Sequence, residues 1–494
     1  MKIIRNIPLL FSLVTLLIGC EPLPANYVKI DVNKSVTCNY EAHIYDLKYN
    51  IIPAADGTTD VYGLYAVCDD GWVEDVNCID PGVMHITIAA NEGAARSTKI
   101  TLYGDNIRPT IISLNQMGVP SAVVDRTLIF HFYGTSLSRW FNTNIEDAKV
   151  AIGEGVLGAN NRVVCIAQSS STAGSIYELC YNPADSSVIK RDIDSFMLSS
   201  PHTTTEEIGE IISKAAQAAP ANSYAMVLAG HGTGWITREI LNNDGDIELL
   251  NCGGYNPWIP AIGAEVTRAF GESNIQFDAS EIADAITHSG IELEYILFDA
   301  CFMSNIEAIY DLRNSAQYII ASPCEIMGKG FPYHRTLPHL FGDNFDLESA
   351  TESYYLYYRD EYSSSSRCGS IALFDCAEIE ALADATRQVM LTATDDYNRN
   401  ELQTYEGQKV HHFYDFGEWV NTVATDDTAL ATFNEQLART VIAKFTLPTF
   451  YSAYGSYGTY DINEEVYSGV TTSAPSEAYP NGWKQTNWYK AIMQ

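Results

Sequence analysis

One stretch, residues 295–307, constrains the fold more than any other part of the chain. It begins with a compact apolar run from Tyr295 to Phe298, and from Asn305 onward apolar residues recur at helical spacing. A buried strand that leads into a helix is typical of a sheet covered by helices. Cys301 lies between the two elements, at the carboxyl end of the strand, where open α/β sheets carry their functional sites.

The position of Cys301 favours nucleophilic chemistry. The first turn of the following helix offers unpaired N–H groups and the positive end of the helix dipole, which favour thiolate over thiol. A lone cysteine in such a place is more often a buried structural residue. The prediction therefore depends on a partner for the thiol.

A second motif supplies that partner. Tyr224 to Ala229 form another buried strand pattern, which ends in Gly230-His231-Gly232. Glycines on both sides of His231 allow another chain to approach the backbone closely. If the two strands are neighbours in a parallel sheet, His231 can take the proton of the Cys301 thiol and later return it to a leaving amine.

The paired motifs resemble the signature of the clostripain family of cysteine peptidases. The resemblance rests on Gly-His-Gly after one strand and Phe298–Glu307 after the next, and it continues from Tyr318 to Tyr333. It covers residues 125–494 as one domain. It implies a caspase-like α/β fold, with a mostly parallel sheet flanked by helices, and hydrolysis of peptide bonds after Arg or Lys. Pro323-Cys324 departs from the Ala-Ser-Glu-like run that is common in the family, which puts details of the substrate pocket in doubt.

The resemblance also assigns roles to individual residues. Asp299 corresponds by its motif position to the acidic residue that binds a substrate Arg or Lys, with Glu325 as a second member of that pocket. The alternative for Asp299 is a structural cap of the following helix. Backbone N–H groups near Gly232 and Cys301 would hold the oxyanion, each typically worth ~3 kcal/mol.

Some members of the family are activated by self-cleavage at a basic residue between the two motifs. Arg238 and Arg268 are the only basic residues in that part of the chain, and Arg268 is the better candidate because Gly271 and Ser273 flank it. Residues 242–248 resemble a fragment of a calcium loop but lack its full spacing, which favours an acidic turn. We expect no cofactor, and calcium dependence is left open.

The amino terminus predicts export. Lys2 and Arg5 precede an apolar run that ends before Cys20, so residues 1–19 match a secretory signal rather than a membrane span. Leu-Ile-Gly-Cys20 also resembles a bacterial lipobox, which implies a lipid on Cys20 and a membrane anchor on the periplasmic or cell-surface face. An ordinary signal peptide is the alternative.

Residues 27–118 predict a separate all-β module. Short runs with alternating polar and apolar residues, separated by turn signals, suggest an immunoglobulin-like sandwich. The run from Ala95 to Gln116 resembles the BACON modules of exported bacterial proteins. A spacer is favoured over glycan attachment, because no exposed aromatic platform can be identified. Gly118 and Pro120 mark the linker to the next domain.

Charge and metal-ligand patterns exclude several function classes. Without residues 1–19 the chain has 27 basic and 62 acidic residues, a net charge of −35, which disfavours nucleic acid as a partner. No Cys-x-x-Cys or His-Glu-x-x-His motif is present, which disfavours a zinc enzyme. Cys38, Cys68 and Cys78 could supply one disulfide.

Two functions from different classes remain. The first is an exported cysteine endopeptidase that acts on proteins or peptides with Arg or Lys before the cleaved bond. The second is a catalytically inactive surface lipoprotein that binds glycans or proteins through its N-terminal module. Both dyad residues in their full motifs favour the peptidase.

Overall fold

The structure of the chain is a computed structural model, which describes residues 27–57, 59–182, 187–200, 204–237, 239–240, 263–268, 278–342, 345–455 and 457–494. These residues divide into two compact units. Unit 1 comprises residues 1–36, 42–90 and 97–114, and unit 2 comprises residues 37–41, 91–96 and 115–494. The predicted signal segment 1–19, Cys20, Arg238 and the acidic turn 242–248 lie outside the described residues.

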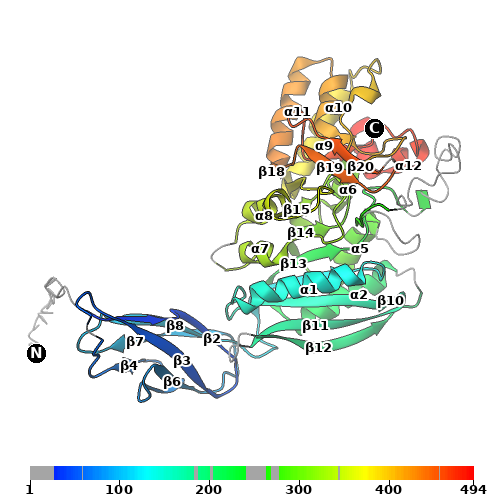
Figure 1. Ribbon diagram of the computed structural model, residues 1–494. Coiled ribbons are helices and arrows are strands. Elements are labelled where there is room, and N and C mark those ends of the chain that lie inside the picture. Colours follow the sequence, from blue (N-terminus) through cyan, green and yellow to red (C-terminus); the bar gives the residue numbers. More distant parts are fainter. Residues whose placement is uncertain are drawn as a thin grey trace, which may run out of the picture. The chain divides into compact units, whose positions relative to one another are not determined.

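Unit 1 is all-β, as the alternating sequence pattern predicts. Its described strands form two four-stranded sheets. The first has the order β1 (Lys29–Val32), β3 (His43–Ile52), β6 (Val83–Ile88), β5 (Val73–Asn77), and the second β2 (Ser35–Cys38), β8 (Thr110–Gln116), β7 (Arg96–Tyr103), β4 (Tyr65–Val67). Every second residue of β6 is buried, which places an apolar face of each sheet in the core of the module. Figure 1 shows this module in blue.

Unit 2 is built on a mixed sheet that has nine strands among the described residues. Its central strands, β10 (Asn161–Ser170), β9 (Val124–Phe132), β13 (Ala221–Ala229), β14 (Leu293–Asp299) and β15 (Ala316–Ala321), are parallel. Antiparallel strands extend both edges: β11 (Ala173–Asn182) and β12 (Ser187–Met197) on one side, β16 (Ile371–Asp375) and β18 (Val441–Phe445) on the other. The predicted α/β class is confirmed, and the parallel part is the centre of the sheet.

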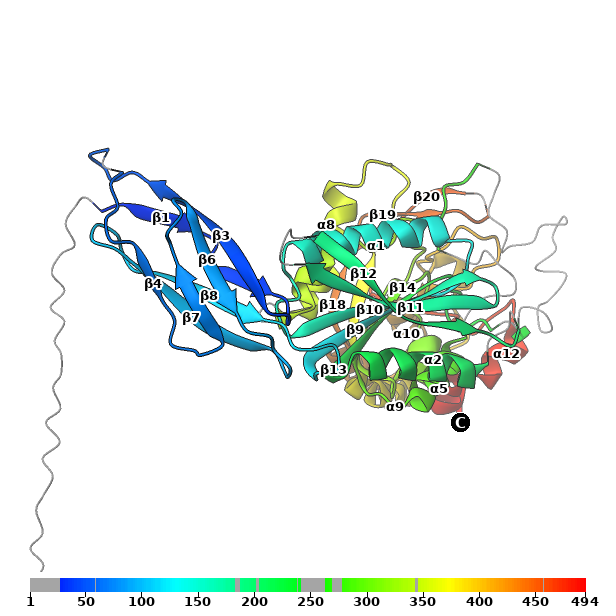
Figure 2. The ribbon, with the colours of Figure 1, turned by 90° about the horizontal axis from the view of Figure 1, so that it is seen from below.

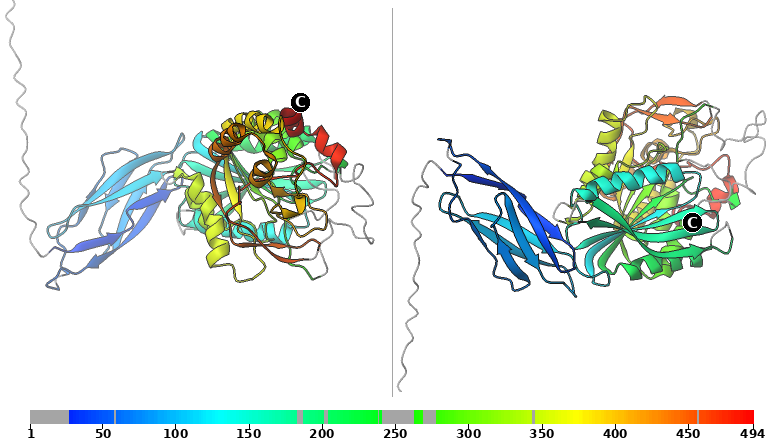
Figure 3. Two further views of the ribbon diagram at one scale, coloured as in Figure 1. Left: turned by 90° about the horizontal axis from the view of Figure 1, so that it is seen from above. Right: turned by 60° about the horizontal axis from the view of Figure 1, so that its bottom comes forward.

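Helices cover both faces of this sheet. Figure 2 and the right-hand view of Figure 3 show α1 (Ser138–Gly153) on one face, and Figure 2 shows α2 (Thr205–Ala218) and α5 (Ala279–Ser289) on the other. Thr204 closes the N-terminus of α2 with a capping box to Glu207. The other described helices of unit 2 are α6 (Ile306–Leu312), α7 (Tyr333–Thr336), α8 (Leu347–Asp360), α9 (Ile379–Met390), α10 (Phe416–Val423), α11 (Asp427–Thr440), α12 (Pro480–Gln485) and α13 (Asn487–Met493). None of the described helices is both long and apolar enough to cross a bilayer.

The C-terminal part adds two short antiparallel strand pairs, β17 (Tyr414–Asp415) with β21 (Thr471–Thr472) and β19 (Thr449–Ser452) with β20 (Gly458–Asp461). Beside β17, the Ser468 N–H donates to the buried carboxylate of Asp415 at 2.8 Å. The disulfide expected among Cys38, Cys68 and Cys78 is absent, since all three are free thiols.

Candidate active site

The two strands that carry the predicted dyad are neighbours. β13 and β14 pair in parallel, with Ala229 opposite Asp299. His231 and Cys301 each lie two residues beyond this pair, so both loops leave the same edge of the sheet at the same level.

The histidine loop packs directly on the cysteine loop. The Gly230 N–H donates to the Asp299 carbonyl at 3.3 Å. A side chain at position 232 would place its Cβ 2.3 Å from the Cys301 carbonyl oxygen and 3.2 Å from the Cys301 nitrogen. Only glycine fits at this close approach. The backbone N–H groups expected to hold an oxyanion are thereby brought together.

His231 has a polar partner that the sequence analysis did not identify. Its Nε2 forms a 2.8 Å hydrogen bond with the Ser136 hydroxyl, from the loop after β9. His231 also lines a cavity of about 20 Å³ with Ala300 and Met303. The hydrogen bond with Ser136 thus orients the imidazole of His231. The cavity that His231 lines is also lined by Ala300, the residue before Cys301.

Cys301 is fully buried. Its Sγ accepts a hydrogen bond from the Ile326 N–H at 2.9 Å, in the loop after β15. Burial raises the pKa of the Cys301 thiol well above its ordinary value, and the nearby Glu325 carboxylate raises it further. The expected helix-dipole effect does not prevail, because four residues separate Cys301 from α6 and Asn305 caps that helix.

The residue after Cys301 has a strained backbone conformation. Phe302 has φ +60°, a value that non-glycine residues adopt rarely. Its N–H donates to the Cys324 carbonyl at 3.0 Å, and its ring stacks on Phe413 with centroids 4.5 Å apart. A Cβ at Gly234, in the histidine loop, would lie 2.9 Å from the Phe413 ring. Phe413 therefore lies against both the loop of His231 and the loop of Cys301.

Asp299 forms a buried ion pair with Arg268. The Nη1 of Arg268 lies 3.0 Å from the Asp299 Oδ2, and both side chains are fully buried. The Tyr333 hydroxyl donates to the same Oδ2 at 2.6 Å. Burial raises the pKa of Asp299, whereas Arg268 and Tyr333 oppose that effect. Since Asn305 caps α6, Asp299 is not the cap of that helix.

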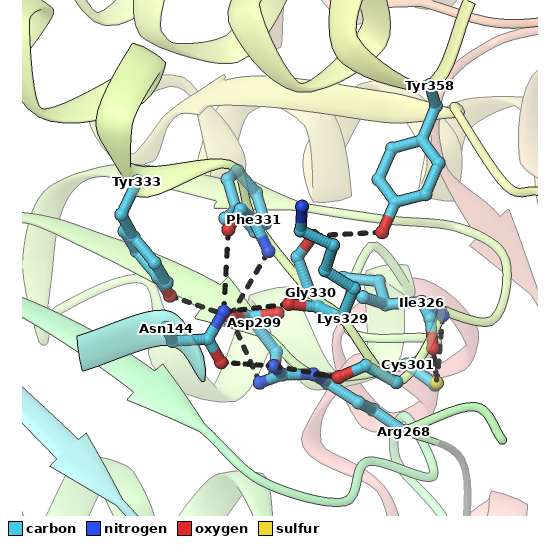
Figure 4. A network of polar contacts seen from close by, with 11 residues as sticks. Asn144, Arg268, Asp299, Cys301, Ile326, Lys329, Gly330, Phe331, Tyr333 and Tyr358 are labelled. Atoms are coloured by element: carbon cyan, nitrogen blue, oxygen red, sulfur yellow. Dashed lines mark hydrogen bonds and ion pairs between the residues drawn. The ribbon is translucent and has the colours of Figure 1, made fainter. Parts of the chain in front are cut away.

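The remaining donors of the Arg268 guanidinium are also satisfied. Its Nη2 donates to the Asn144 side-chain oxygen at 2.5 Å and to the Gly328 carbonyl at 3.2 Å, and its Nε donates to the same carbonyl at 3.3 Å. Asn144 is itself held by the Lys329 carbonyl, to which it donates at 2.7 Å. Figure 4 shows Arg268 and Asp299 within this network, with Cys301 and Ile326 beside it. The pocket matches the planar, five-donor geometry of a guanidinium.

The backbone around Arg268 is held like an added strand. Thr267 forms an antiparallel bridge with Met327, flanked by hydrogen bonds of 2.7 Å from the Arg268 N–H to the Ile326 carbonyl and from the Gly328 N–H to the Val266 carbonyl. The Arg268 carbonyl accepts from the Gly232 N–H at 3.2 Å. Residues 266–268, hereafter the docked segment, therefore run through the site in the manner of a bound peptide.

Glu325 and Asp299 interact with different residues of the docked segment. Asp299 pairs with Arg268, whereas Glu325 interacts with Thr267. Its buried carboxylate accepts from the Ser452 hydroxyl at 2.5 Å and from the Ala453 N–H at 3.1 and 3.2 Å. The Thr267 hydroxyl is also hydrogen bonded to it. The Arg268 guanidinium forms its hydrogen bonds and its ion pair with Asn144, Asp299 and Gly328 instead of with Glu325.

Several residues of the site were missed in the sequence analysis. Ser136, Asn144 and Tyr333 have no motif spacing that links them to Asp299 or His231, although Tyr333 ends the run that carries the family resemblance. Within the described part of the chain, no group of three or more His, Cys, Asp or Glu side chains could hold a metal ion.

Comparison with known proteins identifies the family. The model of the clostripain family matches residues 258–476. A secreted C11 cysteine protease of Bacteroides thetaiotaomicron, called iotapain, is 29% identical, with a TM-score of 0.64 over 75% of this chain and 99% of its own. The chain belongs to the clostripain family of cysteine peptidases. No curated protein matches it.

Two further solved structures align over the same share of the chain. An inactive zymogen of a C11 protease from Parabacteroides distasonis is 26% identical, with a TM-score of 0.62 over 75% of this chain and 99% of its own. A secreted C11 protease of B. thetaiotaomicron in complex with an irreversible peptide inhibitor is 24% identical, with the same TM-score and coverage, and shows the fold. This clostripain-family protein is thus a cysteine endopeptidase that acts on peptide substrates.

Proposed function

We propose that this peptidase cleaves after basic residues through the Cys301–His231 dyad, and that it first cleaves its own chain after Arg268. The observation that carries the proposal is the binding mode of Arg268. One residue presents its side chain to a buried carboxylate, its N–H to Ile326 and its carbonyl oxygen to the Gly232 N–H. These are the contacts that an endopeptidase must make with P1, the residue before the cleaved bond.

The proposed reaction begins with proton transfer from the Cys301 thiol to His231. The thiolate Sγ attacks the P1 carbonyl carbon, and the resulting oxyanion accepts hydrogen bonds from the N–H groups of Gly232 and Cys301. His231 then donates its proton to the leaving amine, and the C–N bond breaks. A water molecule, deprotonated by His231, hydrolyses the thioester and releases the new carboxylate together with the regenerated thiol.

Selectivity for a basic P1 residue follows from charge. The Asp299 carboxylate is buried, and a substrate cation in contact with it is screened far less than at the surface. A neutral P1 side chain would leave this carboxylate without a counter-charge, a cost of several kcal/mol. An acidic P1 side chain would add repulsion.

Before self-cleavage, the docked segment occupies the site that an external substrate needs. The fully buried Cys301 thiol, with its raised pKa, fits a precursor whose nucleophile is not yet accessible to external substrates. We infer that cleavage after Arg268 releases the segment and opens the pocket. Arg238, the second candidate for self-cleavage, lies outside the described residues.

Export and lipid attachment at Cys20 are part of the proposal. They are supported by the signal-like segment of residues 1–19 and by the description of the B. thetaiotaomicron relatives as secreted. The N-terminal β module is proposed as a spacer, with glycan binding as the alternative. Incorporation of a labelled fatty acid into the wild type but not into Cys20→Ala tests the anchor, and equal labelling would contradict it.

The proposal is tested with paired fluorogenic peptides that carry Arg, Lys, Ala or Glu at P1. The wild type should cleave the Arg and Lys peptides only, and Cys301→Ala should cleave none. Intact mass should show cleavage between Arg268 and Ala269 in the wild type and an uncut chain in Cys301→Ala and His231→Ala. An active wild type with an uncut chain would overturn self-processing. A chain that cleaves no peptide even after nicking by trypsin would favour the inactive binding lipoprotein.

A further inference from the structure

Thr267, the residue before Arg268, is the second buried side chain of the docked segment. Only 6% of its surface is exposed, whereas Val266, one residue earlier, is 53% exposed. Neighbouring residues of an extended strand point to opposite sides. The site therefore encloses the side chain at Thr267 and leaves the one at Val266 in solvent.

The partner of Thr267 is the carboxylate of Glu325. This carboxylate is completely buried and accepts from Ser452, Ala453 and the Thr267 hydroxyl. Three donors thus surround one buried acid, and the docked segment supplies one of them. The other two come from Ser452 and Ala453, at the end of β19, and therefore belong to the site rather than to the docked segment.

Loss of the third donor is costly at such a site. A buried acceptor that loses its hydrogen-bond partner incurs the desolvation cost of that group, and the cost is larger for a charged acceptor. Sites built to bind a substrate hydroxyl reject analogues that lack it far more strongly than apolar pockets reject an extra methyl group. An acidic side chain in the same place would bring two carboxylates together.

We propose that Glu325 determines specificity at P2, the residue before the basic one, and that it selects the hydroxyl residues threonine and serine. This inference rests on the proposed function, since it takes the docked segment as the pattern of a bound substrate. It moves Glu325 from the P1 pocket, where the family resemblance put it, to the neighbouring subsite. The P3 side chain, at the position of Val266, should be unselected, because recognition there is by the backbone bond to Gly328.

The first test compares peptides that differ only in threonine or valine at P2, with arginine at P1, on the processed wild-type enzyme at pH 8. Threonine and valine have the same shape, so the comparison isolates the hydroxyl. We expect kcat/KM to be roughly tenfold to a hundredfold higher with threonine. Equal values would overturn the inference. They would leave cleavage after arginine intact, so the two proposals fail separately.

The second test uses Glu325→Gln, which keeps the size of the side chain but replaces one oxygen by an N–H donor. We expect the threonine-to-valine ratio to fall severalfold and a peptide with aspartate at P2, rejected by the wild type, to be cleaved. Glu307→Gln is the matched control. Glu307 is equally buried and also accepts from several donors, namely Asn305, Thr472, Ser473 and Trp483, none of which belongs to the docked segment. An unchanged ratio in Glu325→Gln, or the same fall in Glu307→Gln, would contradict the assignment.

A third measurement does not depend on catalysis. In the uncut Cys301→Ala protein, Thr267→Val should lower the midpoint of urea unfolding more at pH 8 than at pH 5.5, because the hydroxyl stabilises the charged form of Glu325. The other ionisable groups that interact with Glu325 are those of Glu406, Tyr451, Cys324 and Cys368. They are present in both proteins, so their effects cancel in the comparison. A Thr267→Val protein with the same stability loss at both pH values would show that the contact is absent.

Discussion

Arg268 Nη1 lies 3.0 Å from Asp299 Oδ2, with no solvent exposure on either side chain. Thirty-one residues separate the two in the sequence, and they meet because residues 266–268 pair antiparallel with residues 326–328. The pair has a double consequence. In the uncut chain the loss of either charge would leave the other buried and unpaired. In the proposed cleavage the pair is the recognition of the P1 side chain.

The first prediction concerns the stability of the uncut chain. In the Cys301→Ala background, Asp299→Asn should lower the free energy of unfolding by roughly 3–5 kcal/mol, because it leaves the buried guanidinium without its counter-charge. Adding Arg268→Met should recover much of that loss, since the unpaired charge is then removed. Urea unfolding of the Cys301→Ala parent, of the two single variants Asp299→Asn and Arg268→Met, and of the double variant forms a double-mutant cycle. Additive effects of the two changes would mean that the ion pair is not coupled.

The second prediction concerns the choice of arginine. Arg268→Lys should still allow self-cleavage, but at a rate at least tenfold lower than that of the wild type. An ammonium group cannot make the parallel contacts with Asp299, Asn144 and the Gly328 carbonyl that the guanidinium makes. Arg268→Gln should abolish self-cleavage. Intact-mass spectrometry follows the fraction of cut chain over time after refolding or dilution. Equal rates of self-cleavage for the wild type and Arg268→Lys would argue against a pocket that fits the guanidinium group.

The third prediction concerns thiol reactivity. Uncut Arg268→Gln protein should alkylate at Cys301 with iodoacetamide at pH 8 at least a hundredfold more slowly than cut wild type, because the thiol is buried and its pKa is raised. Peptide mapping is required, since Cys68 and Cys78 are partly exposed and free. Those two thiols serve as the internal reference. Equal labelling of Cys301 in both proteins would mean that the docked segment does not protect the nucleophile.

The sequence predicted the central part of this site because its signals are local. Apolar runs mark β13 and β14, and their parallel pairing places the two loops that carry His231 and Cys301 at the same edge of the sheet. Such features depend on a few neighbouring residues and on general rules for strands and caps.

Features that depend on tertiary contacts were not predictable. The strands β11 and β12 were missed because β12 has a largely exposed, polar sequence, and only its pairing with β11 makes it a strand. Glu325 and Asp299 are both acidic and buried, and the sequence does not tell which of them faces a guanidinium. Their separate partners, Thr267 and Arg268, follow from the path of the docked segment.

The fourth prediction concerns Phe413. Its ring contacts strained Phe302, next to the nucleophile, and it lies against Gly234 of the histidine loop. Phe413→Ala should therefore lower kcat about tenfold or more with little change in KM, because it loosens the two catalytic loops rather than the substrate pocket. Phe413→Leu should recover part of the loss. Phe445→Leu is the control, because Phe445 stacks on Tyr355 and does not take part in the Phe302–Phe413 contact. This variant should leave kcat near the wild-type value. A change confined to KM would place Phe413 in substrate binding instead.

The fifth prediction concerns the pH dependence of stability. Burial raises the pKa of Glu325 from its ordinary value of 4.5 to about 7, so the folded uncut protein binds this proton more tightly than the unfolded chain does. The resulting stabilisation is fully present below pH 4.5 and is lost as the pH rises through 7. In the Cys301→Ala background, the free energy of unfolding of the Glu325→Gln variant relative to its parent should therefore rise by on the order of 3 kcal/mol between pH 4.5 and pH 8. Urea unfolding at closely spaced pH values measures this difference, with Glu348→Gln at an exposed position as the control. A difference that does not change with pH would mean that Glu325 titrates like an exposed carboxyl, which contradicts its burial between Thr267 and Ser452.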